Sequence, residues 1–197
     1  MVGSSLFKLQ KGKAASSDEI SPEHLLYSHP ILISLLTLLF NTFLQCGRVP
    51  NSFRQGVIIP VLKSNTSDAS KEENYRGITI SSTLSKIFEV CLKVVFSRFL
   101  ETEELQIGFK AGVGCRDAIL TARSAIQYHT NHGDTVTVCA LDISKAFDRV
   151  DFYCLFLKLM KRNVPKVYLH LIVNWYVNCS AVVKWDNFLN HSIYVLV

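Results

Sequence analysis

The sequence predicts an α+β fold, and three observations carry this prediction. Apolar side chains recur at helical spacing in several segments, among them residues 84–99 and 152–160. Two short apolar runs, at 56–63 and 75–80, are bounded by turn residues and have the pattern of strands. A third run, at 135–143, is β-branched and almost wholly apolar, so it predicts a central strand covered on both faces. With 197 residues, of which 49% are hydrophobic, the chain is long enough to bury a core.

The first part of the chain is expected to hold a lead-in and one helix. Residues 1–21 are polar and predict a loosely ordered segment. A Ser-Pro-Glu sequence at 21–23 is typical of a helix start, because proline fits the first turn. The helix is expected to continue to about Gln45, where Gly47 and Pro50 stop it.

The runs at 56–63 and 75–80 predict a hairpin. Pro60 lacks a backbone N–H, so the first strand is expected at a sheet edge or at a bulge. The polar residues 64–74 join the two strands and predict a long, mobile connection.

The later elements are predicted from the same signals. A glycine-rich loop at 106–115 is expected to lead into a helix that ends near Gly133. An amphipathic helix is expected after the sequence SKAFDRVD and before Pro165. The last segments predict a helix at 167–178 and a hairpin of 181–185 with 192–197.

Composition argues against several classes of protein. The six cysteines include no Cys-x-x-Cys pair and no tight Cys/His cluster, so neither zinc nor a disulfide framework is expected. The most apolar stretch, 25–44, is interrupted by polar residues and predicts a buried helix, not a membrane span. Free thiols, with no export signal over residues 1–13, indicate a reducing compartment. The net charge of +5 suits a phosphate-bearing partner but does not identify one.

Asp142 is the main candidate for chemistry, because it is a carboxylate at the polar end of an apolar strand. Such a group is costly unless it is hydrogen-bonded, paired or bound to a metal. It either caps the next turn or binds an ion, and two-metal phosphoryl transfer needs at least one further carboxylate. Asp148 and Asp151 are nearby in sequence, but both lie where a helix begins, which favours capping. Asp142 as an aspartyl nucleophile is a weaker alternative, because Ser144 stands where a second acid is wanted.

Other candidate binding residues are ambiguous from their patterns alone. Gly108, Gly112 and Gly114 precede a helix and could hold a phosphate, but they match no established nucleotide-binding motif. Lys63 and Arg76, on the two arms of the hairpin, are either solvated or a pair of cations that grips a triphosphate. Two histidines, His129 and His132, are expected at the surface. Three aromatic residues could either stack on bases or pack in the protein: Tyr75, Phe109 and Trp185.

The order of four segments resembles a known family. FRQGVIIPVLK, NYRGITISSTLSKIFE, QIGFKAGVGCRDAI and ALDISKAFDRVD occur in this order. Together they make the chain similar, over roughly residues 8–190, to the reverse transcriptases of non-LTR (LINE-type, jockey-like) retrotransposons.

This resemblance implies a right-hand polymerase fold with fingers and an incomplete palm, and no thumb. Residues 22–133 would form the fingers and the fingers/palm helices, and residues 134–197 the first part of the palm. The reaction would use two Mg²⁺ ions, an RNA template, a DNA primer and deoxynucleoside triphosphates. The roles implied are metal binding by Asp142 and by the backbone carbonyl of Ile143, exclusion of a 2′-hydroxyl by Phe147, and triphosphate binding by Lys63 and Arg76.

The sequence also departs from the family. It contains no Asp-Asp pair, so the Ala-Asp-Asp motif that supplies the other catalytic carboxylates is missing, as is the Gly-x-x-Gln-Gly segment before it. We therefore expect a fragment truncated at both ends that cannot polymerise alone. The alternatives are a non-catalytic nucleic-acid-binding remnant and a decayed copy without a selected role. No membrane is expected as a partner, and the resemblance leaves the compartment open between cytoplasm and nucleus.

Overall fold

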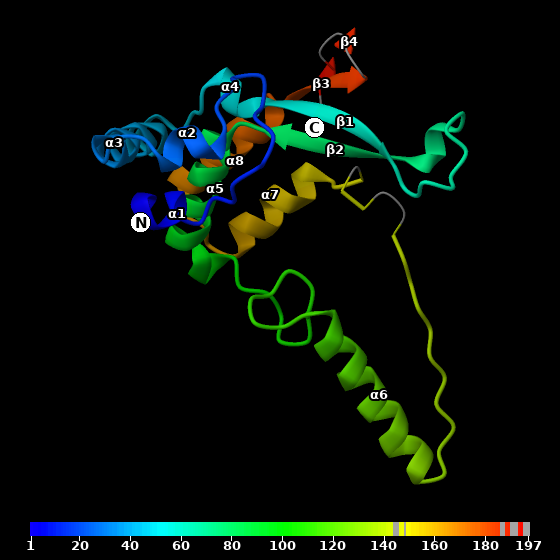
Figure 1. The fold of residues 1–197 in the computed structure, drawn as a ribbon. Helices are drawn as coiled ribbons and strands as arrows, with labels where there is room; N and C mark the ends of the chain where they lie inside the picture. The colour runs from blue at the N-terminus through cyan, green and yellow to red at the C-terminus, as the bar shows by residue number, and fades with distance from the viewer. Residues whose placement is uncertain (144–145, 148, 186–187, 190–192, 195–197) are drawn as a thin grey trace. The chain divides into compact units, whose positions relative to one another are not determined.

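The computed structural model describes residues 1–143, 146–147, 149–185, 188–189 and 193–194 (Figure 1). Contacts divide the chain into two compact units. The first consists of Met1–Phe99 together with Asp151–Val197, and the second is Leu100–Val150. Both helices and strands are present, which agrees with the predicted α+β class. The predicted boundary between 22–133 and 134–197 is a functional division and stays a prediction.

The first unit contains most of the secondary structure. Its helices are α1 (Val2–Leu6), α2 (Pro22–Leu26), α3 (Ile31–Cys46), α4 (Asn51–Arg54), α5 (Thr83–Val95), α7 (Phe152–Lys161) and α8 (Lys166–Val177), with short 3-10 turns at Glu72–Asn74 and Ser97–Phe99. Its strands are β1 (Gln55–Leu62), β2 (Tyr75–Ser81), β3 (Ser180–Trp185), β4 (Phe188–Leu189) and β5 (Ile193–Tyr194).

The strands form one sheet with the order β2-β1-β3-β4, and β5 also pairs with β3. β1 and β2 make the predicted antiparallel hairpin, with Ile59 opposite Ile78. The prediction of an edge position for β1 is wrong for its first half, because Gln55 to Ile58 also pair in parallel with β3.

Pro60 explains why the pairing of β1 with β3 stops where it does. The Lys63 N–H donates to the Asn74 carbonyl at 2.8 Å, so the odd-numbered residues of β1 direct their backbone groups toward β2. The even-numbered residues therefore face β3, and Pro60 is the first of them without an N–H to donate. Beyond Ile58 the hairpin continues as a two-stranded arm.

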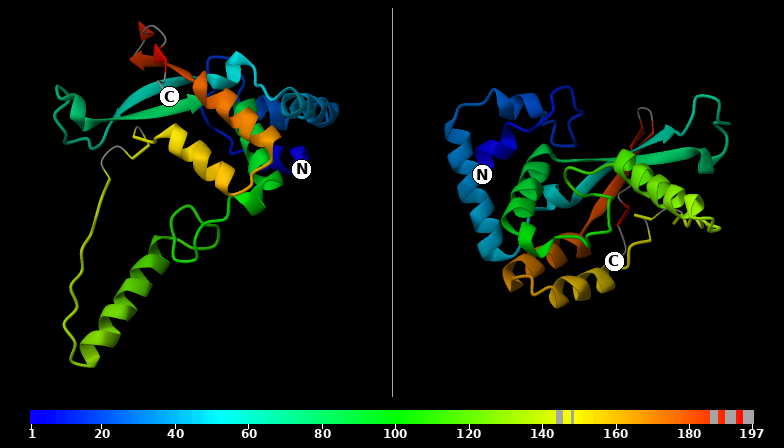
Figure 2. Two further views of the ribbon diagram at one scale, coloured as in Figure 1. Left: turned by 180° about the vertical axis from the view of Figure 1, so that it is seen from behind. Right: turned by 90° about the horizontal axis from the view of Figure 1, so that it is seen from below.

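Aromatic rings from four helices form the centre of the core of the first unit. Phe88 of α5 stacks on Trp175 of α8 with 5.7 Å between ring centroids, and Phe40 of α3 lies 4.8 Å from Phe88. Figure 2 shows α5 between α3 and α8. The indole N–H of Trp175 donates to the backbone carbonyl of Phe53, just before β1, at 3.2 Å. The core therefore anchors the base of the hairpin, and each buried aromatic residue contributes about 2–3 kcal/mol.

The N-terminal segment is not the loosely ordered lead-in expected for residues 1–21. Val2 and Leu6 of α1 are buried, and α1 packs against α5. The Ser82 hydroxyl donates to the Asp18 carboxylate at 2.7 Å, which ties the end of the segment to the start of α5. The prediction missed these few anchoring residues because the segment around them is mostly polar.

The single helix expected over 22–45 is two helices. The first helix, α2, starts at Pro22 as predicted, and the Ser21 hydroxyl caps it by accepting from the His24 N–H. Pro30 causes the break before α3, because the residue that precedes a proline is disfavoured in helical conformation. Gly47 ends α3 with φ of 63°, a left-handed conformation that glycine adopts without strain.

The second unit contains α6 (Cys115–Asn131), which begins and ends close to the predicted positions. The predicted central strand at 135–143 is wrong: these residues are not in a strand, and Leu141 is 93% exposed. A strand needs a partner, and the described strands pair with one another elsewhere in the chain. Among the described residues, no helix is both long and apolar enough to cross a membrane.

Candidate nucleotide-binding site

The β1–β2 hairpin brings Lys63 and Arg76 onto one face. Val61 is opposite Arg76, so these two side chains lie on the same side. Lys63 directly follows β1 and extends the pairing, because its N–H donates to the Asn74 carbonyl at 2.8 Å, which places its side chain on the side of Val61. Lys63 and Arg76 are diagonal neighbours, a relation that places Cβ atoms about 7–8 Å apart. The hairpin therefore makes these two residues, which the sequence singled out, neighbours across its strands.

The Lys63 ammonium has one fixed partner. Its Nζ donates to the backbone carbonyl of Glu73 at 2.6 Å, while the side chain remains exposed. Among the described residues, no carboxylate forms an ion pair with Lys63. The positive charge of Lys63 is therefore held in place without being neutralised.

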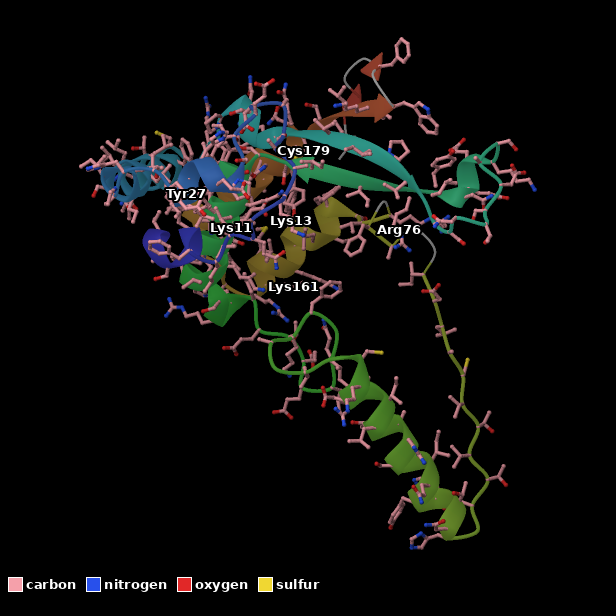
Figure 3. The ribbon with its side chains drawn as sticks, in the orientation of Figure 1. Lys11, Lys13, Tyr27, Arg76, Lys161 and Cys179 are labelled. Carbon is pink, nitrogen blue, oxygen red and sulfur yellow. The ribbon has the colours of Figure 1, made fainter. Side chains whose placement is uncertain are left out.

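Arg76 is exposed near the start of β2 (Figure 3). Within the described part of the chain, its guanidinium has no hydrogen-bond or ion-pair partner. The guanidinium keeps five N–H donors in a planar fork that fits two oxygens of a phosphate.

Apolar side chains continue along the same face toward the base of the hairpin. Val61 is 44% exposed and Ile78 is 48% exposed, and the register places both on the face of the two cations. A ligand with a charged group and a flat apolar body could therefore contact both parts of this surface.

The connection between the strands is more ordered than the mobile loop that the sequence predicted. The amide of Asn74 donates to the Asp68 carbonyl at 2.9 Å, and the Tyr75 hydroxyl donates to the Ala69 carbonyl at 3.0 Å. The sequence offered only a general signal for these residues, since Asn and Asp are common in turns.

Asp142, Ile143 and Phe147 belong to the second unit, where all three are exposed. The Ile143 side chain is 69% exposed and that of Phe147 is 78% exposed. The Phe147 ring makes an edge contact with Phe109, at 6.2 Å between centroids. Asp142 lies in the unpaired segment and not at the end of a strand, contrary to expectation.

The described residues do not form a complete metal site. No group of three His, Cys, Asp or Glu side chains among them could hold an ion. Asp151 is a helix cap, as predicted: its carboxylate accepts from the Cys154 N–H at 2.9 Å, which holds the pKa of Asp151 below its ordinary value. Asp148 and Ser144 lie outside the described residues.

The other candidate positions have structural partners. The carboxylate of Asp117 accepts from the Gly114 N–H at 2.8 Å, which places a negative charge at the start of α6 and disfavours a phosphate there. His129 contacts Asp134 at 2.9 Å. The rings of Tyr75 and Trp185 pack on each other with 5.0 Å between centroids.

Comparison with known proteins identifies the family. The model of the family "Reverse transcriptase (RNA-dependent DNA polymerase)" matches residues 62–195. The chain belongs to this family. The matched segment contains the Lys63–Arg76 face as well as Asp142, Ile143 and Phe147.

Curated relatives of this chain come from retrotransposons. It is 30% identical, over 155 residues and 73% of its length, to a probable RNA-directed DNA polymerase from transposon X-element of Drosophila melanogaster, with 16% of that protein covered. It is 24% identical to the Pol polyprotein of the type-2 retrotransposable element R2DM of the same species, over 77% of this chain and 14% of the relative. The jockey polymerase of that species is 24% identical, over 82% of this chain and 18% of the relative. The predicted likeness to non-LTR reverse transcriptases is confirmed, and the chain spans less than a fifth of the length of these relatives.

Proposed function

We propose that the chain is part of an RNA-directed DNA polymerase and that its β1–β2 hairpin holds the triphosphate of an incoming deoxynucleotide. The pairing of the hairpin supports this proposal, because the exposed residues Lys63 and Arg76 are neighbours across its two strands. A planar guanidinium beside a point-like ammonium suits a chain of phosphate groups. The apolar surface of Val61 and Ile78 would lie against a base or a sugar.

The wider proposal follows the family. Residues 22–133 would be fingers and 134–197 the first part of the palm of a right-hand polymerase that copies an RNA template from a DNA primer. Asp142 and the backbone carbonyl of Ile143 would be metal ligands. Phe147 would lie under the sugar and exclude a 2′-hydroxyl.

Reverse transcriptases generally use divalent metals, and two Mg²⁺ ions are the proposed cofactors of the intact enzyme. One carboxylate cannot hold two such ions in octahedral geometry. Asp142 belongs to no group of three or more His, Cys, Asp or Glu side chains among the described residues that could hold an ion. We therefore expect this chain alone to bind nucleotide without joining it to a primer. The alternative, a non-catalytic nucleic-acid-binding remnant, has less support, because relatives of the chain are named as polymerases.

Titration with dTTP tests the proposed binding function. We expect Lys63→Ala/Arg76→Ala to weaken dTTP binding by at least about 100-fold, because hydrogen bonds to charged groups contribute about 1.5–3 kcal/mol each. Lys8→Ala/Arg123→Ala is the matched control, since it removes the same charge from exposed positions outside the hairpin. Equal binding by the two double variants would contradict the proposal.

A primer-extension assay on an RNA template tests the expected lack of turnover. We expect no extension by the purified chain with Mg²⁺ and all four deoxynucleotides. Extension that disappears in Asp142→Ala would show that this chain completes a metal site by itself, against our expectation.

A further inference from the structure

We infer that the connection 64–74 is a positioning device for Lys63, and that Asn74 and Tyr75 act as positioning residues for triphosphate binding. This inference rests on the proposed function of Lys63. It differs from that proposal in naming two residues that need not touch the nucleotide.

Three hydrogen bonds run from side chains at the two ends of the connection 64–74 to backbone carbonyls within it. The Lys63 ammonium donates to the Glu73 carbonyl, the Asn74 amide donates to the Asp68 carbonyl, and the Tyr75 hydroxyl donates to the Ala69 carbonyl. Because Glu73 directly precedes Asn74 and Tyr75, the last two bonds hold the chain segment that presents the acceptor for Lys63.

The turn inside the connection is stabilised by its own residues. The Asp68 carboxylate accepts from the N–H of Ser70 at 3.0 Å and from its hydroxyl at 2.7 Å. These bonds lower the pKa of Asp68. The Tyr75 ring is fixed from the other side by its contact with Trp185.

The type of acceptor matters for phosphate binding. An ammonium group has three N–H donors, and the Glu73 carbonyl uses one of them. Two donors and the whole positive charge remain available. A carboxylate partner would cancel that charge, whereas a neutral carbonyl orders a flexible side chain and leaves its charge for the ligand.

The first test measures the position of Lys63 without any nucleotide. Acetylation by a reactive ester, followed by mass spectrometry, compares the rate at Lys63 with that at the exposed Lys71 in the same connection. We expect Asn74→Ala/Tyr75→Phe to raise the rate at Lys63 by about three- to tenfold relative to Lys71, because loss of the carbonyl contact frees the amine. Tyr75→Phe keeps the ring and removes only the hydroxyl. An unchanged ratio, with an unchanged circular dichroism spectrum, would overturn the inference.

The second test measures the consequence with inorganic tripolyphosphate as the probe. We expect Asn74→Ala/Tyr75→Phe to weaken its binding by about three- to tenfold. The matched control is Asn178→Ala/Tyr153→Phe, which removes a comparable amide-to-carbonyl bond on α8 and a hydroxyl that is exposed on α7.

The variants separate the two ideas. Weaker binding in Lys63→Ala but wild-type binding in Asn74→Ala/Tyr75→Phe would overturn the positioning role and leave the proposed function intact. Binding that is absent in the wild type, or unaffected by Lys63→Ala, would overturn both.

Discussion

At the scale of single residues, Gly56 shows how tightly the base of the hairpin is built. It is buried, lies opposite Ser81 of β2 and pairs with Ala181 of β3. A Cβ atom at this position would lie 2.7 Å from the γ-methyl of Thr79. The absence of a side chain is therefore needed for close approach of the strands.

We predict that Gly56→Ala lowers the free energy of unfolding by about 1–3 kcal/mol, because Thr79 or the strand must shift. Chemical denaturation provides the measurement. Gly108→Ala is the matched control, since its added Cβ meets nothing within 4 Å, and it should change stability by less than about 0.5 kcal/mol. Equal effects of the two substitutions would contradict the packing described for the hairpin.

At the scale of elements, the caps of the helices were predictable and the pairing of one strand was not. Asp151 caps α7 by accepting from the Cys154 N–H, as expected from a local signal that involves only adjacent residues. The segment 135–143 has the apolar, β-branched pattern of a strand, but a strand forms only where a partner strand pairs with it, and the local sequence does not specify that partner. Pro30 was a signal in the sequence for a break between two helices. The long apolar pattern around it led instead to the prediction of one helix.

The cap of α7 gives a pH-dependent prediction. Asp151→Ala should lower the thermal midpoint by a few degrees at pH 7, whereas Asp151→Asn should retain most of the cap. The folded pKa of Asp151 is depressed by the bond from the Cys154 N–H, so its contribution is present above the unfolded pKa and is lost as pH falls through the folded value. The difference between wild type and Asp151→Asn should therefore shrink below about pH 4. A difference independent of pH would rule out this role for the carboxylate.

The same contrast between local and remote signals applies to the candidate site. Asp142, Lys63 and Arg76 were candidates from their positions in the sequence, and Ile143 and Phe147 were named from the family resemblance. That the two cations share a face depends on the register of the hairpin. The bonds from Asn74 and Tyr75 to carbonyls across the connection have no periodic pattern that a sequence could display.

At the scale of the whole molecule, the two units differ in how much they bury. In the first unit, Ile87 and Leu171 are fully buried, at 0% exposure. In the second, α6 has no buried residue, and the segment 135–143 makes no backbone hydrogen bond among the described residues. Protection from solvent should follow this difference.

Hydrogen exchange tests this difference directly. We predict that amides at 135–143 exchange near the rate of an unfolded chain, while those in the middle of α5 are slowed by at least about a thousandfold, because they open only with the core. Slow exchange at 135–143 would mean that this segment is paired, contrary to the structure.

The central claim is that the Lys63–Arg76 face holds the triphosphate of a deoxynucleoside triphosphate. Photo-cross-linking tests it most directly. A deoxynucleoside triphosphate with a photoreactive group on its γ-phosphate is irradiated with the full chain, and the labelled peptide is located by mass spectrometry. We predict labelling within residues 55–81, competed by unlabelled dTTP and lost in Lys63→Ala/Arg76→Ala. Competable labelling that lies elsewhere, or that persists in this double variant, would contradict the account.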